Sequence, residues 1–291
     1  AQVKPDIIIS VPLIIEKIYK TKLKPIADKT IVKMLLKAPI IDTMLKNKIL
    51  SALIESFGGR FYEIIIGGAA MNKEVETFLK KIGFPYTIGY GMTECGPIIG
   101  YEDWSKHKLG SCGKTVPRME VKIDSADPAK IVGEILVRGA NVMMGYYKNE
   151  EATKAAFTED GWLRTGDLGL KDKNGNIYIK GRSKNMILGA NGQNIYPEEI
   201  EDVLNSLEYV NESLVKEDNG RLVALVFLDQ DRLDSKHISS SSYSEILEQI
   251  KQQANSQLAN YEQLSAVFIH EEEFEKTPKR SIKRYLYTTK R

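Results

Sequence analysis

Short apolar segments alternate with helical segments through residues 1–104, and this order constrains the fold more than any other feature of the sequence. The apolar runs predicted as strands are 6–12, 61–66 and 86–88. The stretches with helical spacing of apolar residues are 13–20, 30–57 (interrupted near Pro39) and 72–82. Such a β-α-β order predicts a mainly parallel sheet covered by helices. Ligands of these sheets bind beyond the carboxyl ends of the strands, where Gly67-Gly68 and Gly89-Tyr90-Gly91 lie.

The rest of the chain changes character twice. Residues 105–183 carry short segments of period-two polarity separated by turns, which predicts a small antiparallel β subdomain. The strands expected there are 120–123, 133–138 and 176–180, with a helix at 149–157. The last part predicts helices at 197–207 and 244–259, strands at 222–227 and 266–269, and an exposed serine loop at 239–242. We therefore expect an α/β part at 1–104, the β-rich part at 105–183 and a small α+β C-terminal domain at 184–291.

Composition excludes several classes of protein. The 41 basic and 39 acidic side chains leave a net charge of +2, which is no footprint for nucleic acid. Two cysteines and three widely separated histidines fit neither a disulfide framework nor a transition-metal site. No apolar run reaches the roughly 18 residues of a membrane span, and no signal pattern opens the chain. We expect a cytoplasmic protein that does not bind nucleic acid.

The segment Gly89–Pro97 carries side chains suited to a nucleotide. Its glycines allow a tight turn and a close approach of the backbone to a ligand. Thr93 offers a hydroxyl to a phosphate oxygen, and Glu94 offers a carboxylate of the kind that holds Mg²⁺ together with substrate phosphates. Tyr90 presents a flat ring on which a base can stack. The alternative is a glycine-rich turn in which Thr93 only caps the following residues.

Asp167 and Arg182 flank a hairpin through Gly175 that would bring them onto one ligand. A carboxylate accepts hydrogen bonds from two vicinal hydroxyls and so suits a ribose, and an arginine adds donors of fixed geometry for ribose or phosphate oxygens. The alternative is a surface ion pair that contributes under about 1 kcal/mol.

Three segments in this order, 89–97, 161–169 and 180–186, resemble the nucleotide-handling motifs of the adenylate-forming (AMP-binding) enzymes, most closely the long-chain fatty acid–CoA ligases. The resemblance covers nearly the whole chain and implies that ATP or AMP, Mg²⁺ and coenzyme A are its ligands. It implies that Tyr90 stacks on adenine, Thr93 contacts the α-phosphate and Glu94 holds the metal. The residues implied to contact the nucleotide are Gly67, Gly68, Ala69, Tyr90, Gly91, Thr93, Asp167, Ile179 and Arg182. An ordinary turn at Gly67-Gly68 and core packing of Ile179 explain those residues equally well.

The same resemblance assigns roles to the small domain. Lys184 matches the hinge about which this domain moves between two half-reactions. Gly189 and Gly192 lie in a loop that, in the family, meets the incoming thiol. An ordinary polar turn is the alternative for that loop.

The segment 277–284 resembles the final motif of the family, which supplies a lysine to the adenylation step. The lysine position holds Ser281, so Lys279 or Lys283 on either side is the expected catalytic cation. The alternatives are a protein that adenylates slowly without this cation, and a different alignment of the segment. If the segment is a strand, both side chains point to the same side as Ser281.

No Ser/Thr/Gly-rich phosphate loop ending in lysine precedes Gly89, so 1–183 is expected to be an incomplete large AMP-binding domain, a remnant of an α/β fold. The resemblance implies that the whole enzyme converts a long-chain fatty acid, ATP and CoA into acyl-CoA, AMP and pyrophosphate, and that this chain by itself is inactive. Gly91 stands where acetate-using relatives carry a bulky Trp and therefore implies an acyl pocket open to longer chains. A lipid substrate also implies peripheral contact with membranes. The alternatives are a domain that activates amino or acyl acids for a carrier protein, and a non-catalytic nucleotide-binding module.

Overall fold

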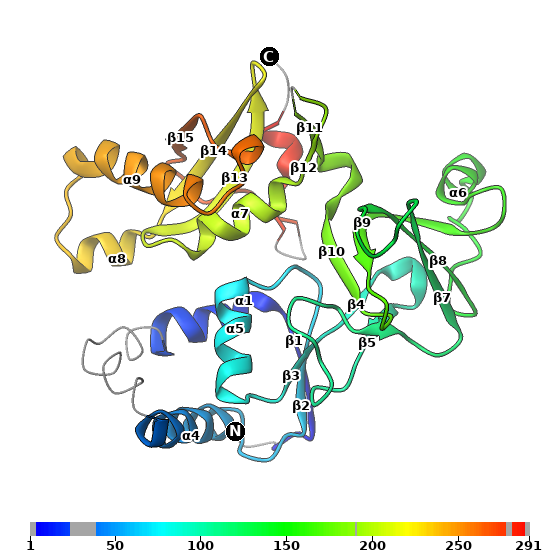
Figure 1. Ribbon diagram of the computed structural model, residues 1–291, viewed down its shortest axis with the longest axis horizontal. Coiled ribbons are helices and arrows are strands. Elements are labelled where there is room, and N and C mark those ends of the chain that lie inside the picture. The colour runs from blue at the N-terminus through cyan, green and yellow to red at the C-terminus, as the bar shows by residue number, and fades with distance from the viewer. Residues whose placement is uncertain (1–3, 24–38, 190, 278–280, 289–291) are drawn as a thin grey trace. The chain divides into compact units, whose positions relative to one another are not determined.

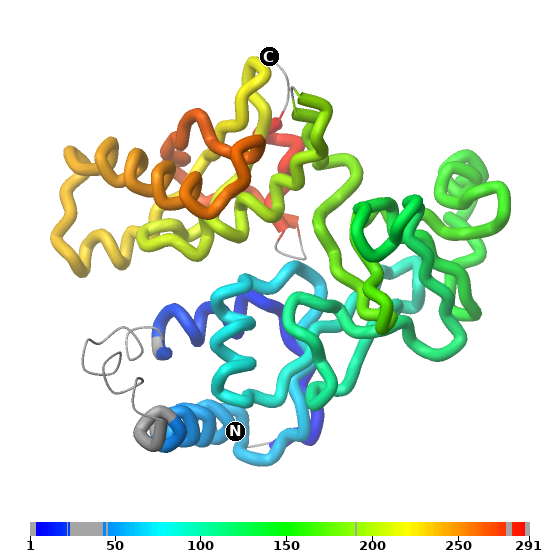
Figure 2. Tube along the Cα trace, in the orientation of Figure 1, coloured from blue at the N-terminus to red at the C-terminus, as the bar shows by residue number. Residues whose placement is uncertain are grey.

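The computed structural model describes residues 4–23, 39–189, 191–277 and 281–288, and the other residues are drawn in grey in Figure 2. The chain divides into two compact units. The first comprises Ala1–Thr165 and Gly169–Ile179, and the second comprises Gly166–Leu168 and Lys180–Arg291. Within the described residues, no helix is both long enough and apolar enough to cross a membrane.

A three-stranded parallel sheet with helices on it forms the first part of the first unit, as the sequence predicts. Its strands are β1 (Ile7–Ser10), β2 (Glu63–Ile66) and β3 (Tyr86–Ile88), and its helices are α1 (Pro12–Ile18), the π-helical turn η1 (Tyr19–Leu23), α4 (Pro39–Ser56) and α5 (Lys73–Ile82). Figure 1 shows α1, α4 and α5 beside this sheet. Ile15 of α1, Leu53 of α4 and Leu79 of α5 pack with Ile64 and Ile66 of β2 in one buried cluster. The three helices therefore cover the face of the sheet that these two isoleucines present.

Local sequence sets several boundaries in this part. The predicted strand 6–12 is too long, because Pro12 is the first residue of α1, where its fixed φ suits a helix and its missing N–H costs no hydrogen bond. Of the predicted helix 30–57, the described part forms α4 from Pro39 to Ser56, and residues 30–38 lie outside the described residues. Asn72 caps α5 as expected, since its side chain accepts hydrogen bonds from Glu74 N and Val75 N.

The β-rich part of the chain forms two further sheets. The strands of the first are β4 (Tyr90–Gly91), β5 (Ile98–Tyr101) and β6 (Lys114–Thr115); those of the second are β7 (Met119–Asp124), β8 (Gly133–Gly139), β9 (Leu163–Lys171) and β10 (Ile177–Arg182), and the helix α6 (Glu150–Ala156) follows β8. Strands β7 and β8 are antiparallel, as predicted. Strand β9 was not predicted, because Gly166 and Gly169 within it are typical of turns.

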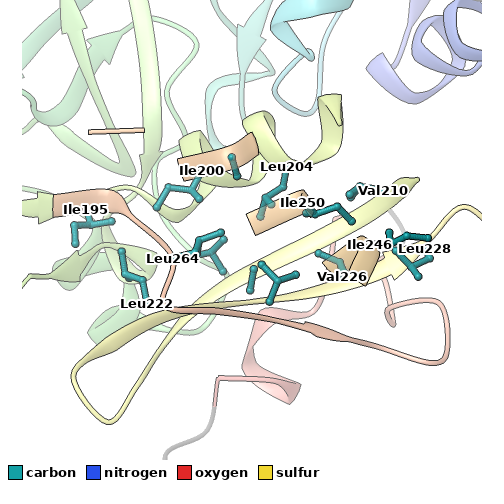
Figure 3. Close-up of a cluster of buried hydrophobic side chains, with 14 of the residues drawn as sticks. Ile195, Ile200, Leu204, Val210, Leu222, Val226, Leu228, Ile246, Ile250 and Leu264 are labelled. Atoms are coloured by element: carbon teal, nitrogen blue, oxygen red, sulfur yellow. The ribbon is translucent and has the colours of Figure 1, made fainter. Parts of the chain in front are cut away.

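A sheet of three strands with helices on one face forms most of the second unit. Its elements are β11 (Ile187–Leu188), β12 (Asn194–Ile195), α7 (Pro197–Ser206), β13 (Val210–Asp218), β14 (Arg221–Leu228), α8 (Gln230–Ser235), α9 (Tyr243–Asn255) and β15 (Ala266–Ile269). Strand β14 is central, antiparallel to β13 and parallel to β15. Figure 3 shows Ile200 and Leu204 of α7 and Ile250 of α9 gathered with Val226 and Leu228 of β14 in the buried core of this unit.

Two predictions in this unit need correction. Strand β13 was missed because Asn211, Glu212 and Lys216 break its apolar pattern. The serine run expected as a loop contains a short 3₁₀ turn, η4 (Ser240–Ser242), which leads directly into α9. The unit is mixed α and β, as the sequence predicts.

Candidate functional site

The two glycine turns of the first unit lie side by side at the carboxyl ends of β2 and β3. Gly89 N donates to Ile66 O at 2.9 Å, and a Cβ on Gly67 would lie 3.3 Å from Gly89 O. Gly68 has a φ of 91°, a conformation that favours glycine. Gly68 and Ala69 are exposed. The fold therefore brings the predicted adenine-side loop beside the segment Gly89–Pro97.

The turn after Gly91 is a short 3₁₀ helix, η2 (Thr93–Cys95), closed by hydrogen bonds. Met92 N donates to Pro97 O at 2.8 Å, and Gly96 N donates to Thr93 O at 3.3 Å. Thr93 is exposed and Glu94 is half-buried, so both side chains are accessible to a ligand.

Tyr90 has a packing role in the structure and Gly91 a backbone role, in addition to the ligand contacts predicted for them. Tyr90 is only 6% exposed and belongs to a core cluster with Ile99 and Ile177. A Cβ on Gly91 would lie 2.1 Å from Pro97 O, so this position requires glycine whatever the substrate. The stacking of adenine on Tyr90 and the acyl pocket at Gly91 stay predictions.

Glu94 has the surroundings expected of a ligand for a hard cation. Its Oε1 accepts a hydrogen bond from the Tyr146 hydroxyl at 3.1 Å. Among the residues that the structure describes, none forms an ion pair with Glu94, and no three His, Cys, Asp or Glu side chains gather as a metal site. A single uncompensated carboxylate beside the Thr93 hydroxyl fits Mg²⁺, which is usually held by one or two carboxylates and substrate phosphates.

Asp167 and Arg182 meet in the second unit. Arg182 Nε lies 2.8 Å from Asp167 Oδ1, and the side chains are 50% and 8% exposed respectively. Gly166, with a φ of 70°, precedes the aspartate. The hairpin therefore joins the two residues as expected, and the side chain of Arg182 is half exposed to solvent. Ile179 is half-buried against the core cluster of the first unit, which agrees with its packing interpretation.

The predicted hinge residue Lys184 lies in the 3₁₀ turn η3 (Ser183–Asn185) and is exposed. Next to it, Asn185 Nδ2 donates to Glu198 Oε1 of α7 at 2.6 Å. This contact ties the residue after Lys184 to the body of the second unit. Motion about Lys184 stays a prediction.

The predicted thiol-side loop connects β11 and β12. Gly189 N donates to Gln193 O and Gly192 N donates to Gly189 O, both at 2.8 Å, and Gly192 has a φ of 78°. A groove of about 460 Å³ runs along this hairpin. Its lining residues include Leu188, Gly189, Asn191, Arg221, Tyr261 and Gln263. The groove offers both apolar and polar side chains to a ligand of the second unit.

The two described ends of the C-terminal motif lie beside each other. Lys276 pairs with Ile282 across an isolated antiparallel bridge, and Thr277 N donates to Ser281 O at 2.8 Å. The strand expected through the motif stays untested, because residues 278–280 lie outside the described residues. Lys279 lies outside the described residues. Lys283 Nζ lies 3.1 Å from Glu275 Oε2, and this hydrogen bond raises the pKa of Lys283.

Sequence reasoning missed two residues with contacts at these sites. Tyr146 reaches Glu94 from 52 residues away. Arg284, beside Lys283, donates from Nη1 to both carboxylate oxygens of buried Glu201 at 2.6 and 2.8 Å, and from Nη2 to Val215 O at 2.7 Å. The basic pair Lys283-Arg284 was the one sequence signal for Arg284. Nothing local in the sequence indicated Tyr146.

Comparison with known proteins identifies the family. The model of AMP-binding enzymes matches residues 1–147, and that of the AMP-binding enzyme C-terminal domain matches residues 184–290. The chain therefore belongs to the AMP-binding enzyme family, as its motifs predict. Its relatives include enzymes named long-chain-fatty-acid–CoA ligases.

Individual relatives cover different parts of the chain. The long-chain-fatty-acid–CoA ligase FadD15 of Mycobacterium bovis is 32% identical over 256 residues, which are 79% of this chain and 41% of that protein. The 2-succinylbenzoate–CoA ligase of Bacillus pumilus is 40% identical over 181 residues, 60% of this chain and 36% of that protein. This chain thus spans less than half the length of either relative.

Solved structures agree with this placement. The O-succinylbenzoate CoA synthetase of Bacillus subtilis in complex with AMP has a TM-score of 0.68 at 30% identity, covering 84% of this chain and 50% of that one. Its complex with ATP and magnesium ion has a TM-score of 0.63 at 30% identity, covering 82% and 49%. The fold described above is therefore part of an adenylate-forming fold.

Proposed function

We propose that the protein containing this chain is an AMP-forming CoA ligase that activates a long-chain fatty acid. The fatty acid carboxylate attacks the α-phosphate of Mg-ATP, which yields an acyl-adenylate and pyrophosphate. The CoA thiol then attacks the acyl carbon and displaces AMP. The observation that carries the proposal is the similarity to FadD15, which extends over 79% of the chain and so includes both units.

The residues of the first unit supply the metal and phosphate contacts in this proposal. Glu94 holds Mg²⁺ through its carboxylate, and Thr93 donates its exposed hydroxyl to the α-phosphate. Gly68 and Ala69, which are exposed beside the paired glycine turns at Gly67 and Gly89, approach adenine. When bound, the metal offsets negative charge on the phosphates during adenylation.

The residues of the second unit supply ribose and thiol contacts. Asp167 accepts hydrogen bonds from the ribose hydroxyls, and the exposed side of Arg182 donates to ribose or phosphate oxygens. The groove beside Gly189 and Gly192 supports a role of that hairpin in binding CoA. Rotation about Lys184 would alternate the use of these contacts between the two half-reactions.

An aryl acid is the second candidate substrate. The 2-succinylbenzoate–CoA ligase of B. pumilus matches at 40% identity, although over only 181 residues. The glycine at position 91 does not decide between the acids, because Pro97 O already excludes a side chain there. Activation of acids for a carrier protein and nucleotide binding without catalysis stand as further alternatives.

Mass spectrometry of the acyl-CoA products of the full-length protein tests the proposal. The protein would be given ATP, Mg²⁺ and CoA with an equimolar panel of acids that runs from acetate through C18 fatty acids and includes 2-succinylbenzoate. We expect long-chain acyl-CoA to dominate and residues 1–291 alone to yield none. If succinylbenzoyl-CoA dominates, 2-succinylbenzoate replaces the long-chain fatty acid as the proposed substrate. If no acid yields a thioester, the result supports the non-catalytic alternative.

A further inference from the structure

One loop of the first unit holds the turn that carries Glu94. Asn141 Nδ2 donates to Cys95 O at 2.6 Å and to Ile98 O at 2.9 Å. Met143 N donates to Glu94 O at 2.7 Å, and the Tyr146 hydroxyl donates to Glu94 Oε1 at 3.1 Å. Three of these bonds fix the backbone of the turn, and only the bond from Tyr146 acts on its side chain.

The loop is itself fixed by α6. Tyr146 N donates to Thr153 Oγ1 at 2.9 Å, and Thr153 Oγ1 donates to Asn149 O at 2.7 Å. Asn149 caps α6 through a bond from Ala152 N at 3.0 Å. A Cβ on Gly145 would lie 2.6 Å from Thr153 Cγ2, so glycine lets the loop pack this closely. The Tyr146 backbone is therefore anchored independently of Glu94.

We propose that Tyr146 is a positioning residue for the metal ligand Glu94, an inference that rests on the proposed function. A phenol donates one hydrogen bond, and an ionised carboxylate accepts it on one oxygen. Oε1 is thereby held, and Oε2 accepts no hydrogen bond from any other described residue. The carboxylate is presented in one orientation with one oxygen available to Mg²⁺. Partners that orient a metal ligand in this way contribute to metal affinity without touching the metal.

Core packing does not account for the contact. Tyr146 is 41% exposed, so its ring is not a buried filler. The contact of Tyr146 with the Glu94 side chain is made by its hydroxyl. A phenylalanine at position 146 would keep the ring and remove this hydrogen-bond donor. The neighbouring Tyr147 is 88% exposed and forms no contact with Glu94. Tyr147→Phe is therefore a matched control for Tyr146→Phe.

The experiment measures Mn²⁺ affinity by electron paramagnetic resonance in the full-length protein saturated with a non-hydrolysable ATP analogue. We expect Tyr146→Phe to weaken Mn²⁺ binding by about 10-fold or more, the usual effect of losing an outer partner of a metal ligand. Tyr147→Phe should match the wild type. Pyrophosphate exchange should require correspondingly more Mg²⁺ in Tyr146→Phe, while thioester formation from supplied acyl-adenylate is unchanged.

Equal Mn²⁺ affinity in Tyr146→Phe and the wild type would overturn the inference, as would the absence of any Mn²⁺–nucleotide binding in the wild type. The proposed function is judged separately by its acyl-CoA products. If the protein makes acyl-CoA and Tyr146→Phe leaves Mn²⁺ affinity unchanged, only the positioning role of Tyr146 is lost. If the protein makes no acyl-CoA but Tyr146→Phe weakens Mn²⁺ binding, only the ligase proposal is lost.

Discussion

The metal and cation roles proposed for adenylation fall on residues of different units. Glu94 belongs to the turn of the first unit, whereas Ser281 and Lys283 belong to the C-terminal segment of the second unit. Their surroundings differ: Glu94 is held by a neutral phenol, whereas Lys283 is already paired with the Glu275 carboxylate. Substitutions at these positions therefore separate the metal role from the cation role.

Glu94→Gln should lower ATP–pyrophosphate exchange by about 10²-fold in the full-length enzyme, the size of losing one preorganised electrostatic contact to the transition state. The amide oxygen still accepts the Tyr146 bond, so the turn keeps its geometry while the charge that holds Mg²⁺ is lost. Thioester formation from supplied acyl-adenylate should change little. Glu151→Gln, exposed on α6, is the control. Equal losses in both half-reactions would instead indicate misfolding.

Ser281→Lys should raise pyrophosphate exchange by about 10-fold or more, because it restores a cation at the position where the family keeps one. The ammonium of Lys283 is already held by the Glu275 carboxylate, so Lys283→Ala should have a small effect. Ser240→Lys, on an exposed turn, controls for added charge. A strong loss in Lys283→Ala, with no gain in Ser281→Lys, would show that Lys283 already supplies the cation.

Among the elements, the C-terminal 3₁₀ turn η6 (Arg284–Leu286) depends on a buried ion pair with α7 and β13. Glu201 is 9% exposed, accepts two bonds from Arg284 and a third from Val215 N at 2.6 Å. Burial raises the pKa of Glu201 from 4.5 to about 7, against the lowering effects of Arg284 and the Val215 N–H. The turn η6, which follows the C-terminal motif, is thus linked to a titrating carboxyl group.

The stability of this unit should consequently fall as pH rises from about 4.5 to about 7, because the folded state binds the proton of Glu201 more tightly than the unfolded state over that window. In Arg284→Met the cation is gone and the pKa of Glu201 rises further, so the loss extends to higher pH. We expect the destabilisation by Arg284→Met to be larger at pH 8 than at pH 5 by at most about 1.4 kcal/mol, because pH 8 lies only one unit above the pKa of about 7 that Glu201 has beside Arg284.

Hydrogen exchange of β13 and β14 amides at the two pH values measures this effect in the second unit alone. The exposed pair of Arg232 with Glu208, 3.4 Å apart, provides the control variant Arg232→Met, which should cost little at either pH. A destabilisation of Arg284→Met that is the same at pH 5 and pH 8 would contradict the titration of Glu201.

At the scale of the 291-residue chain, the parallel sheet has an exposed apolar edge at β1. Exposed large hydrophobic side chains concentrate on β1 and the start of α1: Ile7, Ile9, Val11, Leu13 and Ile14. Strand β1 ends the order β1-β2-β3 among the described strands. An exposed apolar strand at a sheet edge is a template for association with other chains.

The isolated 291-residue chain should therefore self-associate, and Ile9→Lys should reduce this association. Ile9 is 83% exposed, so the substitution should change the free energy of unfolding by no more than about 0.5 kcal/mol. Light scattering with size-exclusion chromatography measures the association. Ile131→Lys replaces an isoleucine that is 51% exposed elsewhere and should have no such effect. Equal behaviour of the two variants would show that β1 is not the associating edge.

The sequence by itself determined what depends on neighbouring residues. Helix α5 with its Asn72 cap, the start of α7 at Pro197 and the parallel order of β1, β2 and β3 follow from periodicity, capping and turn residues. The glycine turn at the end of β2 follows as well, since few residues other than glycine adopt the φ of 91° that Gly68 has. The ligands could be predicted from the family motifs because the residues of each motif are contiguous in the sequence.

Only the tertiary structure decided the contacts between distant segments. Strand β9 contains two glycines and β13 several polar residues, so pairing with neighbouring strands, rather than local preference, makes them strands. The bond from Tyr146 to Glu94 spans 52 residues, and that from Arg284 to Glu201 spans 83. Such contacts form because burial and packing bring distant segments together. The periodicity of side chains along the sequence does not indicate which distant residues will be in contact.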